Sequence, residues 1–328
     1  MNIVELTRLC YPEMSERGQR FMTALLDEGP LFRMMNNFDL EATNYQYRPA
    51  AGTQTLSARA LTGSYSPSNL TQAALQAVAH KIHGFILDYD ESHEKDHELG
   101  IGIDIDRWLD RELARRGKAV YRAIEELFFK GDGASNNFKG LRAFLNGTDN
   151  IPGFSTTGVV NAKTLTGATG DSLNLGTKAS WPLFKEALEE QLQDVDADVI
   201  IANRTLGARI TTIAKESKIY HWEKDEFGRK VDFYDGIPIM RVLNTSIPLD
   251  EPDDAGSPAE ETTSVYLAKN SESEWGCASN SGLAYWDAGE LKETKMSRTA
   301  KFEFRGSLFF HDDKAVRRIR NIKVGAIS

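Results

Sequence analysis

The chain has 328 residues, of which 41% are hydrophobic and 27% charged, a composition typical of a soluble folded protein of about two domains. It contains no run of eighteen apolar residues, and its first ten residues lack the basic start and apolar block of a secretory signal. We therefore expect neither a membrane span nor secretion. The net charge of −9 argues against a protein whose main task is to grip nucleic acid.

The first 40 residues contain one short stretch with helical character, Glu16 to Leu26, followed by the aperiodic segment LFRMMNNFDL. We expect an arm that packs on another surface. Cys10 in this arm and Cys277 far along the chain are too few for a metal site, and we expect both to be packing residues in a reducing compartment.

Residues 41–80 are polar, and no lysine occurs before Lys81. Two stretches, Asn44 to Arg48 and Thr53 to Ala60, flank the turn residues Pro49 to Gly52 and predict a β-hairpin. Isolated two-stranded hairpins are marginally stable in water, so this hairpin needs a partner surface. The next stretch, Leu70 to Leu87, has an apolar pattern compatible with a helix.

The acidic segment DYDESHEKDHE then leads into the most regular pattern of the chain, a helix predicted over residues 104–130. Asp104 or Asp106 can cap its N-terminus, and Gly131 and Gly133 supply the stop. Its apolar stripe has steps of one, three, four and seven residues and consists of Ile105, Leu109, Leu113, Val120, Ile124, Leu127 and Phe128. Such a helix would be roughly 40 Å long, which predicts an elongated subunit.

Residues after the helix are rich in Gly, Thr and Asn and have no clear period up to Thr177, whereas the pattern sharpens at Ser180, which we expect to cap a helix beginning at Trp181. The elements predicted after that helix are a buried strand at Val199 to Ala202, a second helix ending near Lys218, a hairpin turning at Asp235-Gly236, and strands at Thr263 to Lys269, Gly282 to Trp286 and Lys301 to His311. A segment from Lys314 to Val324 closes the chain. Helix, strand, helix and hairpin together predict a small α/β domain.

Charge is unevenly distributed along the chain. Residues 88–112 hold ten acids and three bases, a sum of −7, whereas residues 292–323 hold ten bases and four acids, a sum of +6. Segments of opposite sign can pair within a subunit or between copies, and the alternative is that each is a solvated face. The basic residues from Lys314 to Lys323 favour a half-buried element that is solvated or meets acids of a neighbour over one that binds nucleic acid.

One cluster has an enzyme-like spacing, and it consists of His80, His83, His93 and His97 with acids between them. Helices can turn such spacings into a metal site, which leaves a metal-dependent enzyme as an alternative. No cysteine accompanies the cluster, so a solvated connector is the preferred interpretation. The strand and helix near residues 199–210 carry no phosphate-binding glycine motif, and no G-x-S-x-G elbow occurs. We therefore predict no catalytic, cofactor or metal residues.

The order of these parts resembles the major capsid proteins of tailed bacteriophages, the Hong Kong 97-type shell proteins. The resemblance rests on the arm, the polar hairpin, the long helix followed by FFKGDGASNNFKGLRAFL, the unit ALEEQLQDVDADVIIANRTLGARI, the hairpin YDGIPIMRV and the final KFEFRGSLFFHDDKAVRRI. The "GDG then F-x-GL" turn and the D-x-x-G-I-P-I hairpin are its most specific pieces.

The resemblance implies an α+β capsid fold with an N-terminal arm, an extended E-loop hairpin, a peripheral domain built on the long helix, and an axial domain. The implied division is arm 1–40, E-loop and return 41–80, peripheral domain 81–180 with its spine helix 104–130, axial domain 181–290, peripheral long strand 291–312, and return to the axial domain 313–328. Subunit contacts would come from Tyr45, Tyr47, Arg48 and Arg59 in the E-loop, and intersubunit charge pairs from Asp104, Asp106, Arg317 and Arg318.

The implied function is that of a virion protein assembled in the bacterial cytoplasm. It would self-assemble into hexamers and pentamers of an icosahedral head that encloses double-stranded DNA without reading its sequence, together with a portal and a separate scaffold or decoration protein. An encapsulin-type nanocompartment of the same fold is the nearest alternative. Some relatives carry a scaffolding segment of domain length before the hairpin, or cross-link a hairpin lysine to a neighbour's asparagine. Only some forty residues precede the hairpin here, and the hairpin has no lysine, so we expect no large maturation cleavage and a non-covalent shell.

Overall fold

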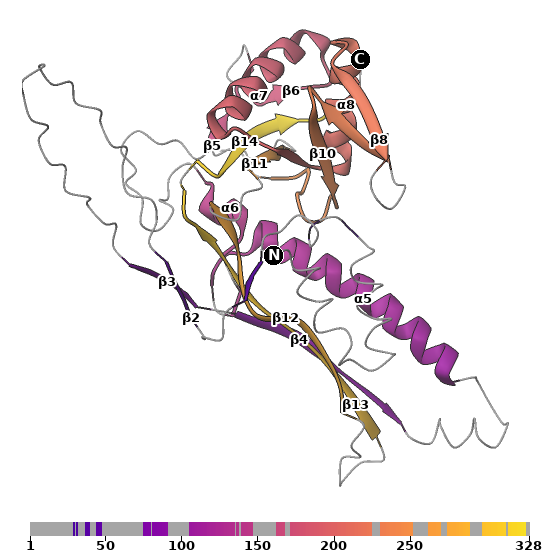
Figure 1. The fold of residues 1–328 in the computed structure, drawn as a ribbon. Helices are drawn as coiled ribbons and strands as arrows, with labels where there is room; N and C mark the ends of the chain where they lie inside the picture. Colours follow the sequence, from indigo (N-terminus) through magenta and orange to yellow (C-terminus); the bar gives the residue numbers. More distant parts are fainter. Residues whose placement is uncertain are drawn as a thin grey trace, which may run out of the picture.

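The computed structural model describes residues 29, 31, 37–39, 44–47, 75–79, 81–90, 105–134, 136–137, 139–146, 162–167, 171–224, 230–251, 262–269, 274–288, 297–312 and 314–325. These residues form two regions, an elongated lower region and an upper region built on a larger sheet (Figure 1). Among them, no helix has the length and apolar character required to cross a membrane.

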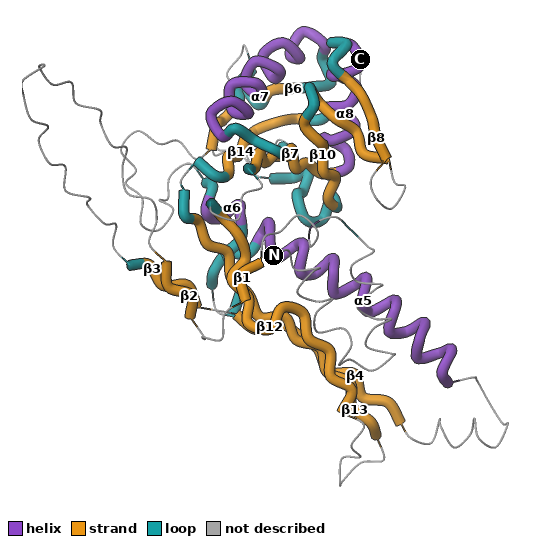
Figure 2. The backbone as a smooth tube through the Cα atoms, viewed as in Figure 1, coloured by secondary structure: helices purple, strands orange, loops and turns teal. Residues whose placement is uncertain are grey.

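The lower region is a four-stranded sheet with one long helix lying along it (Figure 2). Its strands, in spatial order, are β1 (Asn37–Asp39), β12 (Trp275–Ala288), β13 (Ser297–Phe310) and β4 (Lys81–Asp90). The helix α5 (Ile105–Lys130) confirms the helix predicted over 104–130. The described part of its apolar stripe, Val120 to Phe128, packs on the sheet. There Phe85 of β4 lies opposite Phe302 of β13, and their ring centroids are 5.7 Å apart.

The prediction of a helix-compatible segment at residues 70–87 is wrong for its described part, which forms β3 (Gln76–Ala79) and β4. Exposure alternates along residues 81–86, so Ile82 and Ile86 point away from the side on which His83 and Phe85 are half-buried. Short apolar runs fit both periods. Pairing with ten residues of β13 decides the outcome here, because each strand residue gains ladder hydrogen bonds that an isolated short helix would lack.

The strand β2 (Asn44–Tyr47) confirms the first strand of the predicted hairpin, and its partner in the structure is β3, with Tyr45 opposite Val78. The predicted partner, Thr53 to Ala60, lies outside the described residues, as does the predicted helix Glu16 to Leu26. The pairing of β2 with β3 brings together the two ends of the segment between them.

The upper sheet has eight strands in the order β5-β14-β11-β7-β10-β9-β8, with β6 also paired to β14. The bounds are β5 (Ala162–Thr164), β6 (Leu173–Asn174), β7 (Val199–Asn203), β8 (Tyr220–Lys224), β9 (Lys230–Tyr234), β10 (Ile237–Val242), β11 (Thr263–Ala268) and β14 (Val316–Lys323). Two helices pack on it, α7 (Trp181–Val195) and α8 (Arg204–Glu216). The predicted strand at 199–202, the two helices, the hairpin and the strand at 263–269 are all confirmed, whereas β8 was not anticipated.

Both faces of the upper sheet are buried at its central strands, which explains the continuous apolar run of β7. Ile200 and Ala202 belong to the core that contains α7 and α8. Val199 and Ile201 belong to the core that also contains the C-terminal half of α5 and the lower sheet. A sheet covered on both faces has no polar side, so its central strands lose the alternation of half-buried strands.

Sheet membership differs from the sequence division at two points. β5 and β6, which that division placed with the lower region, pair with β14 of the upper sheet. β12, which it placed wholly with the upper region, pairs with β13. Linear boundaries miss these assignments because strand pairing joins segments that are distant in sequence.

The start of α7 also differs in detail from the prediction. A short 3-10 helix, η2 (Lys178–Ser180), leads directly into it, and the Ser180 side chain makes no capping hydrogen bond because the Ser180 backbone is already helical. Trp181 instead fixes this corner by donating its indole N–H to the carbonyl oxygen of Leu175 at 2.9 Å.

The end of α5 joins the two regions. The buried carboxylate of Glu125 accepts hydrogen bonds from the Leu243 backbone N–H at 3.0 Å and from the Ser246 hydroxyl at 2.7 Å. One turn later the Phe129 ring lies 5.5 Å from the ring of Tyr266 on β11. The segment after α5 then turns back through Gly133, which has a φ of +74°, to the short helix α6 (Leu141–Phe144).

Candidate subunit-contact surfaces

The outward side of β4 is an apolar surface at the edge of the lower sheet. Ile82 is 55% exposed and Ile86 59% exposed, and Leu75 beside β3 is 52% exposed. Within the described residues, β4 pairs on one side only, with β13. A long edge strand with exposed apolar side chains is a template for association with another chain, so this face is a candidate contact.

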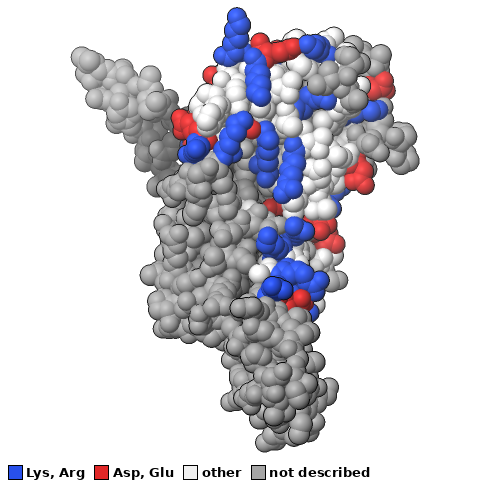
Figure 3. Space-filling model, turned by 90° about the vertical axis from the view of Figure 1, so that its right-hand side faces the viewer, with Lys and Arg blue, Asp and Glu red and all other residues white. Residues whose placement is uncertain are grey.

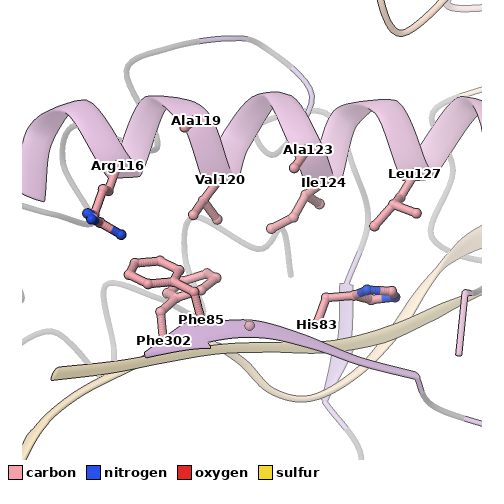
Figure 4. A pocket seen from close by; sticks show the side chains of 10 residues that line it. His83, Phe85, Arg116, Ala119, Val120, Ala123, Ile124, Leu127 and Phe302 are labelled. Carbon is pink, nitrogen blue, oxygen red and sulfur yellow. The ribbon is translucent and has the colours of Figure 1, made fainter. Parts of the chain in front are cut away.

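A second apolar feature is a pocket of about 390 Å³ between α5 and the lower sheet. Figure 4 shows Val120, Ile124 and Leu127 pointing from α5 toward the sheet, whose strands carry Phe85 and Phe302. The other lining residues are His83, Gly84, Arg116, Ala119 and Ala123. The pocket is the space that the described side chains leave between the helix and the sheet. Its lining is mainly apolar, and its polar groups do not converge on one point.

The polar groups of this pocket lie on opposite sides of it (Figure 4). Burial, followed by the nearby Lys81 charge, lowers the pKa of His83 below its usual value, so its imidazole is neutral at pH 7. The Arg116 guanidinium lies 5.9 Å from the Phe85 ring centroid and donates to Glu112 at 2.9 Å.

His83 is the one member of the predicted histidine cluster that the structure describes, because His80, His93 and His97 lie outside the described residues. The described part of the chain contains no group of three or more His, Cys, Asp or Glu side chains that could hold a metal ion. The described residues therefore form no metal centre.

The predicted E-loop contacts are only partly in view. Tyr45 and Tyr47 lie on β2, whereas Arg48 and Arg59 lie outside the described residues. Asp106 lies in the first turn of α5, and Asp104 precedes the described part of the helix.

The expectation that Arg317 and Arg318 make intersubunit charge pairs is wrong. Their side chains are 2% and 7% exposed, and both pair within the chain, Arg317 with Asp194 at 3.2 Å and Arg318 with Glu251 at 3.0 Å. The cause is the position of β14 between β11 and β5, which buries side chains on both faces of the strand. The segment from Lys314 to Lys323 was predicted to be half-buried with a solvated basic side. Most of it is instead the interior strand β14.

A basic surface that the sequence analysis missed lies on α5. Arg111, Arg115, Lys118 and Arg122 are all exposed, and their steps of four, three and four residues place them on one side of the helix. We call these four residues the basic stripe. The spacing of these bases is a sequence signal that predicts it, but a charge sum taken over residues 88–112 hides it because acids dominate that segment.

On the upper region, the exposed edge is β8. The side chain of Trp222 is 52% exposed there, and the neighbouring His221 ring stacks on Phe233 of β9 with centroids 4.5 Å apart. An exposed tryptophan on an edge strand is a further candidate for a contact between subunits.

Comparison with known proteins gives one consistent result. The sequence model of the phage capsid family matches residues 14–249, and no curated protein matches significantly. Among solved structures, the chain is similar to the SrpI encapsulin of Synechococcus elongatus PCC 7942, with a TM-score of 0.58, 14% identity, and coverage of 91% of this chain and 89% of that chain.

Two further similar structures are also particle shells. The capsid of an empty GTA particle has a TM-score of 0.57 and 14% identity, with coverage of 90% of each chain. The procapsid of satellite phage P4 has a TM-score of 0.52 and 12% identity, with coverage of 94% of this chain and 92% of that chain. These likenesses show a shared fold, and the family match extends over more than two thirds of the 328 residues. The chain belongs to the phage capsid family and has the α+β fold of its Hong Kong 97-type shells.

Proposed function

We propose that this shell protein is the major capsid protein of a tailed bacteriophage, forming hexamers and pentamers that close into an icosahedral head around double-stranded DNA. The observation that carries the proposal is the phage capsid match over residues 14–249, joined to a fold shared with the capsid of a GTA particle over 90% of both chains. Assembly would take place in the host cytoplasm with a portal and a separate scaffold or decoration protein.

The proposed capsid domains correspond to the two regions of the structure and to the segments before them. Residues 41–80 act as the E-loop, with Tyr45, Tyr47, Arg48 and Arg59 contacting a neighbouring subunit. Residues 1–40 act as the arm, the lower region as the peripheral domain and the upper region as the axial domain. Asp104 and Asp106, at the start of α5, remain candidates for charge pairs between subunits, with bases other than Arg317 and Arg318 as their partners.

The outward face of β4 supports assembly directly. A monomer that left Ile82 and Ile86 more than half exposed would hold two large apolar side chains of this face in water, and a second copy of the chain that covered them would gain about 25 cal/mol for each Å² of apolar area buried. We propose that this face is covered when subunits assemble.

An encapsulin-type compartment is the second candidate, because the similarity to the SrpI encapsulin extends over 91% of this chain. The two functions differ in what the shell contains. Nuclease-protected DNA inside purified particles supports the head, whereas protein cargo without DNA supports the compartment.

The first experiment is the particle size of the purified protein by size-exclusion light scattering, with negative-stain imaging of the same fractions. We expect closed shells tens of nanometres across, or pentamers and hexamers able to form them. The variant Ile82→Asp/Ile86→Asp is expected to remain folded and fail to assemble, because each aspartate places a charge in the proposed contact. Leu183→Asp, at a residue of α7 that is 49% exposed, controls for the effect of adding an acid to an exposed apolar site. A stable monomer or dimer from the wild-type chain would contradict the proposal.

A further inference from the structure

The basic stripe occupies the side of α5 opposite the sheet. With about 100° of rotation per residue, Arg111, Arg115, Lys118 and Arg122 fall within about 60° of arc. Val120, Ile124 and Leu127, which point toward the sheet (Figure 4), fall about 180° from them on the same helical wheel. The lower region therefore has a sheet face with exposed isoleucines and a helix face with exposed bases.

The stripe also faces the side on which the upper region lies. Glu125 and Phe129 continue the same side of α5, and both are buried against Leu243, Ser246 and Tyr266 of the upper region. The basic stripe ends about one turn before this contact. Figure 3, which turns toward the viewer the side of Figure 1 where α5 and β8 lie, shows Lys and Arg side chains gathered in a column from the upper region to the lower.

The charge of this part of α5 is opposite to that of the whole chain. Over residues 111–130, α5 holds six bases and three acids, a sum of +3, whereas the chain carries −9. Among the three acids, Glu125 is buried under the upper region and the carboxylate of Glu112 is only 14% exposed. The guanidinium of Arg115, in contrast, is on a side chain that is 77% exposed.

We propose that the basic stripe lines the inside of the shell and contacts the phosphate backbone of the enclosed double-stranded DNA without reading its sequence. This rests on the proposed function. The stripe extends over about 17 Å of helix, and duplex DNA presents one phosphate charge about every 1.7 Å of its axis, so all four cations can meet phosphates at once. The sheet face, with Ile82 and Ile86, then faces away from the DNA.

The composition of the stripe favours phosphate over a protein partner. Protein interfaces have an apolar centre, whereas no exposed large apolar side chain occurs on α5 among its residues with described side chains. Three of the four cations are arginines, whose planar fork binds phosphate oxygens in pairs. Arg115 shares its charge with Glu112 through two hydrogen bonds of 3.0 and 2.8 Å, which keeps the contact weak enough for DNA to enter and leave.

The test compares amine reactivity in filled and emptied particles. Lys118 is acylated by a small reagent, and its modification rate is measured by peptide mass spectrometry in intact particles and in particles from which the DNA has been released. We expect Lys118 to react several-fold more slowly in filled particles. Lys178, whose side chain is 60% exposed on the upper region, is expected to react equally in both.

A charge variant provides the second readout. Arg115→Gln/Lys118→Gln/Arg122→Gln keeps good helix formers on α5 and is compared with Lys163→Gln/Lys178→Gln/Lys185→Gln, which removes the same charge elsewhere. Binding of a short DNA duplex to unassembled subunits is followed across salt concentrations. The slope of log K against log salt is negative, and the α5 variant is expected to make it less steep by about 2.7, the contribution of three phosphate contacts. The control variant is expected to leave the slope unchanged.

The outcomes distinguish a failure of the stripe's assignment from a failure of the proposed capsid function. Filled particles in which Lys118 reacts as fast as in emptied ones overturn the assignment of the stripe and leave the capsid function standing. Equal salt slopes for wild type and the α5 variant do the same. Particles that contain protein and no DNA overturn the proposed enclosure of DNA, and with it this inference.

Discussion

At the scale of single residues, the buried pair of Arg318 and Glu251 fixes β14 in the upper sheet. The Arg318 guanidinium donates to Glu251, to the Ser264 hydroxyl at 2.9 Å and to the Leu145 carbonyl oxygen at 3.2 Å. Ser264 in turn donates to Glu251. The cluster thus ties two neighbouring strands to the end of α6, and every polar group has a partner inside the protein.

We predict that Glu251→Gln lowers the free energy of unfolding by about 3–5 kcal/mol, because it leaves a buried guanidinium without its counter-charge. Chemical denaturation of unassembled subunits measures the loss. The double variant Arg318→Met/Glu251→Leu should recover much of it, since apolar side chains of similar size replace both charges. Glu216→Gln, which breaks the exposed pair with Lys178, is the control and should have little effect. Equal stability of Glu251→Gln and wild type would contradict the prediction.

Arg317 depends on a more exposed partner, and this makes its contribution dependent on pH. Burial raises the pKa of Asp194, but hydrogen bonding from Lys314 and the charge of Arg317 outweigh it, so the pKa lies below its usual value of 3.8. A carboxyl whose folded-state pKa is lowered stabilises the protein above its unfolded-state pKa, and this stabilisation is lost as the pH falls through the folded-state value.

Asp194→Asn should therefore lower the melting temperature at pH 7, and the difference from wild type should close as the pH falls below about 4. Thermal unfolding between pH 3 and pH 8 tests this. Glu190→Gln, at a side chain 59% exposed on the same helix, serves as the matched control. A difference that stays constant across the pH range would show that Asp194 acts through packing and not through its charge.

At the scale of elements, the turn after α5 explains the most specific motif of the sequence. Gly140 donates its backbone N–H to the Gly131 carbonyl oxygen at 2.8 Å, and a Cβ at Gly140 would lie 2.7 to 2.9 Å from backbone atoms of Gly131, Leu127 and Phe128. Only glycine permits this approach of α6 to the end of α5.

We predict that Gly140→Ala destabilises the subunit by about 1–3 kcal/mol, because the added carbon forces two backbones apart. Gly167→Ala is the control, since its Cβ would meet only ordinary contacts at 3.5 Å and beyond. Urea unfolding of both variants measures the difference. If the two alanine variants had equal free energies of unfolding, the backbone between α5 and α6 would have moved to accommodate the added carbon, and the prediction would be wrong.

The same scale shows what sequence patterns can predict. The long helix and the hairpin at Asp235-Gly236 were predicted because a 3.6-residue stripe and a turn with positive φ are local properties. β4 and β14 were misjudged because their character comes from neighbours distant in sequence, β13 for the former and β11 and β5 for the latter. Periodicity cannot tell a basic strand enclosed on both faces from a solvated one, since its counter-charges at positions 194 and 251 come from other segments.

At the scale of the whole molecule, the sequence indicated an elongated shell subunit through the order of its parts, and it placed one contact type incorrectly. Arg317 and Arg318 stabilise the inside of the subunit, whereas the exposed surfaces in the described part of the chain include the isoleucines of β4, the basic stripe and Trp222. Exposure depends on how the two regions pack, and no local pattern encodes it. Surfaces for assembly therefore had to come from the fold.

The last prediction concerns what holds the shell together. The proposed E-loop has no lysine between residues 41 and 80, so it cannot supply the lysine of a lysine–asparagine cross-link. Cys277 is buried, and burial raises the pKa of its thiol to about 12, which leaves it protonated and unreactive toward disulfide exchange. Mature particles boiled in detergent without reductant should therefore release single chains, seen as one band at the mass of one chain in denaturing electrophoresis. A ladder of covalent multiples that persists with reductant would show a cross-link from another residue. A ladder that disappears with reductant would point to Cys10, because Cys277 is enclosed within each subunit.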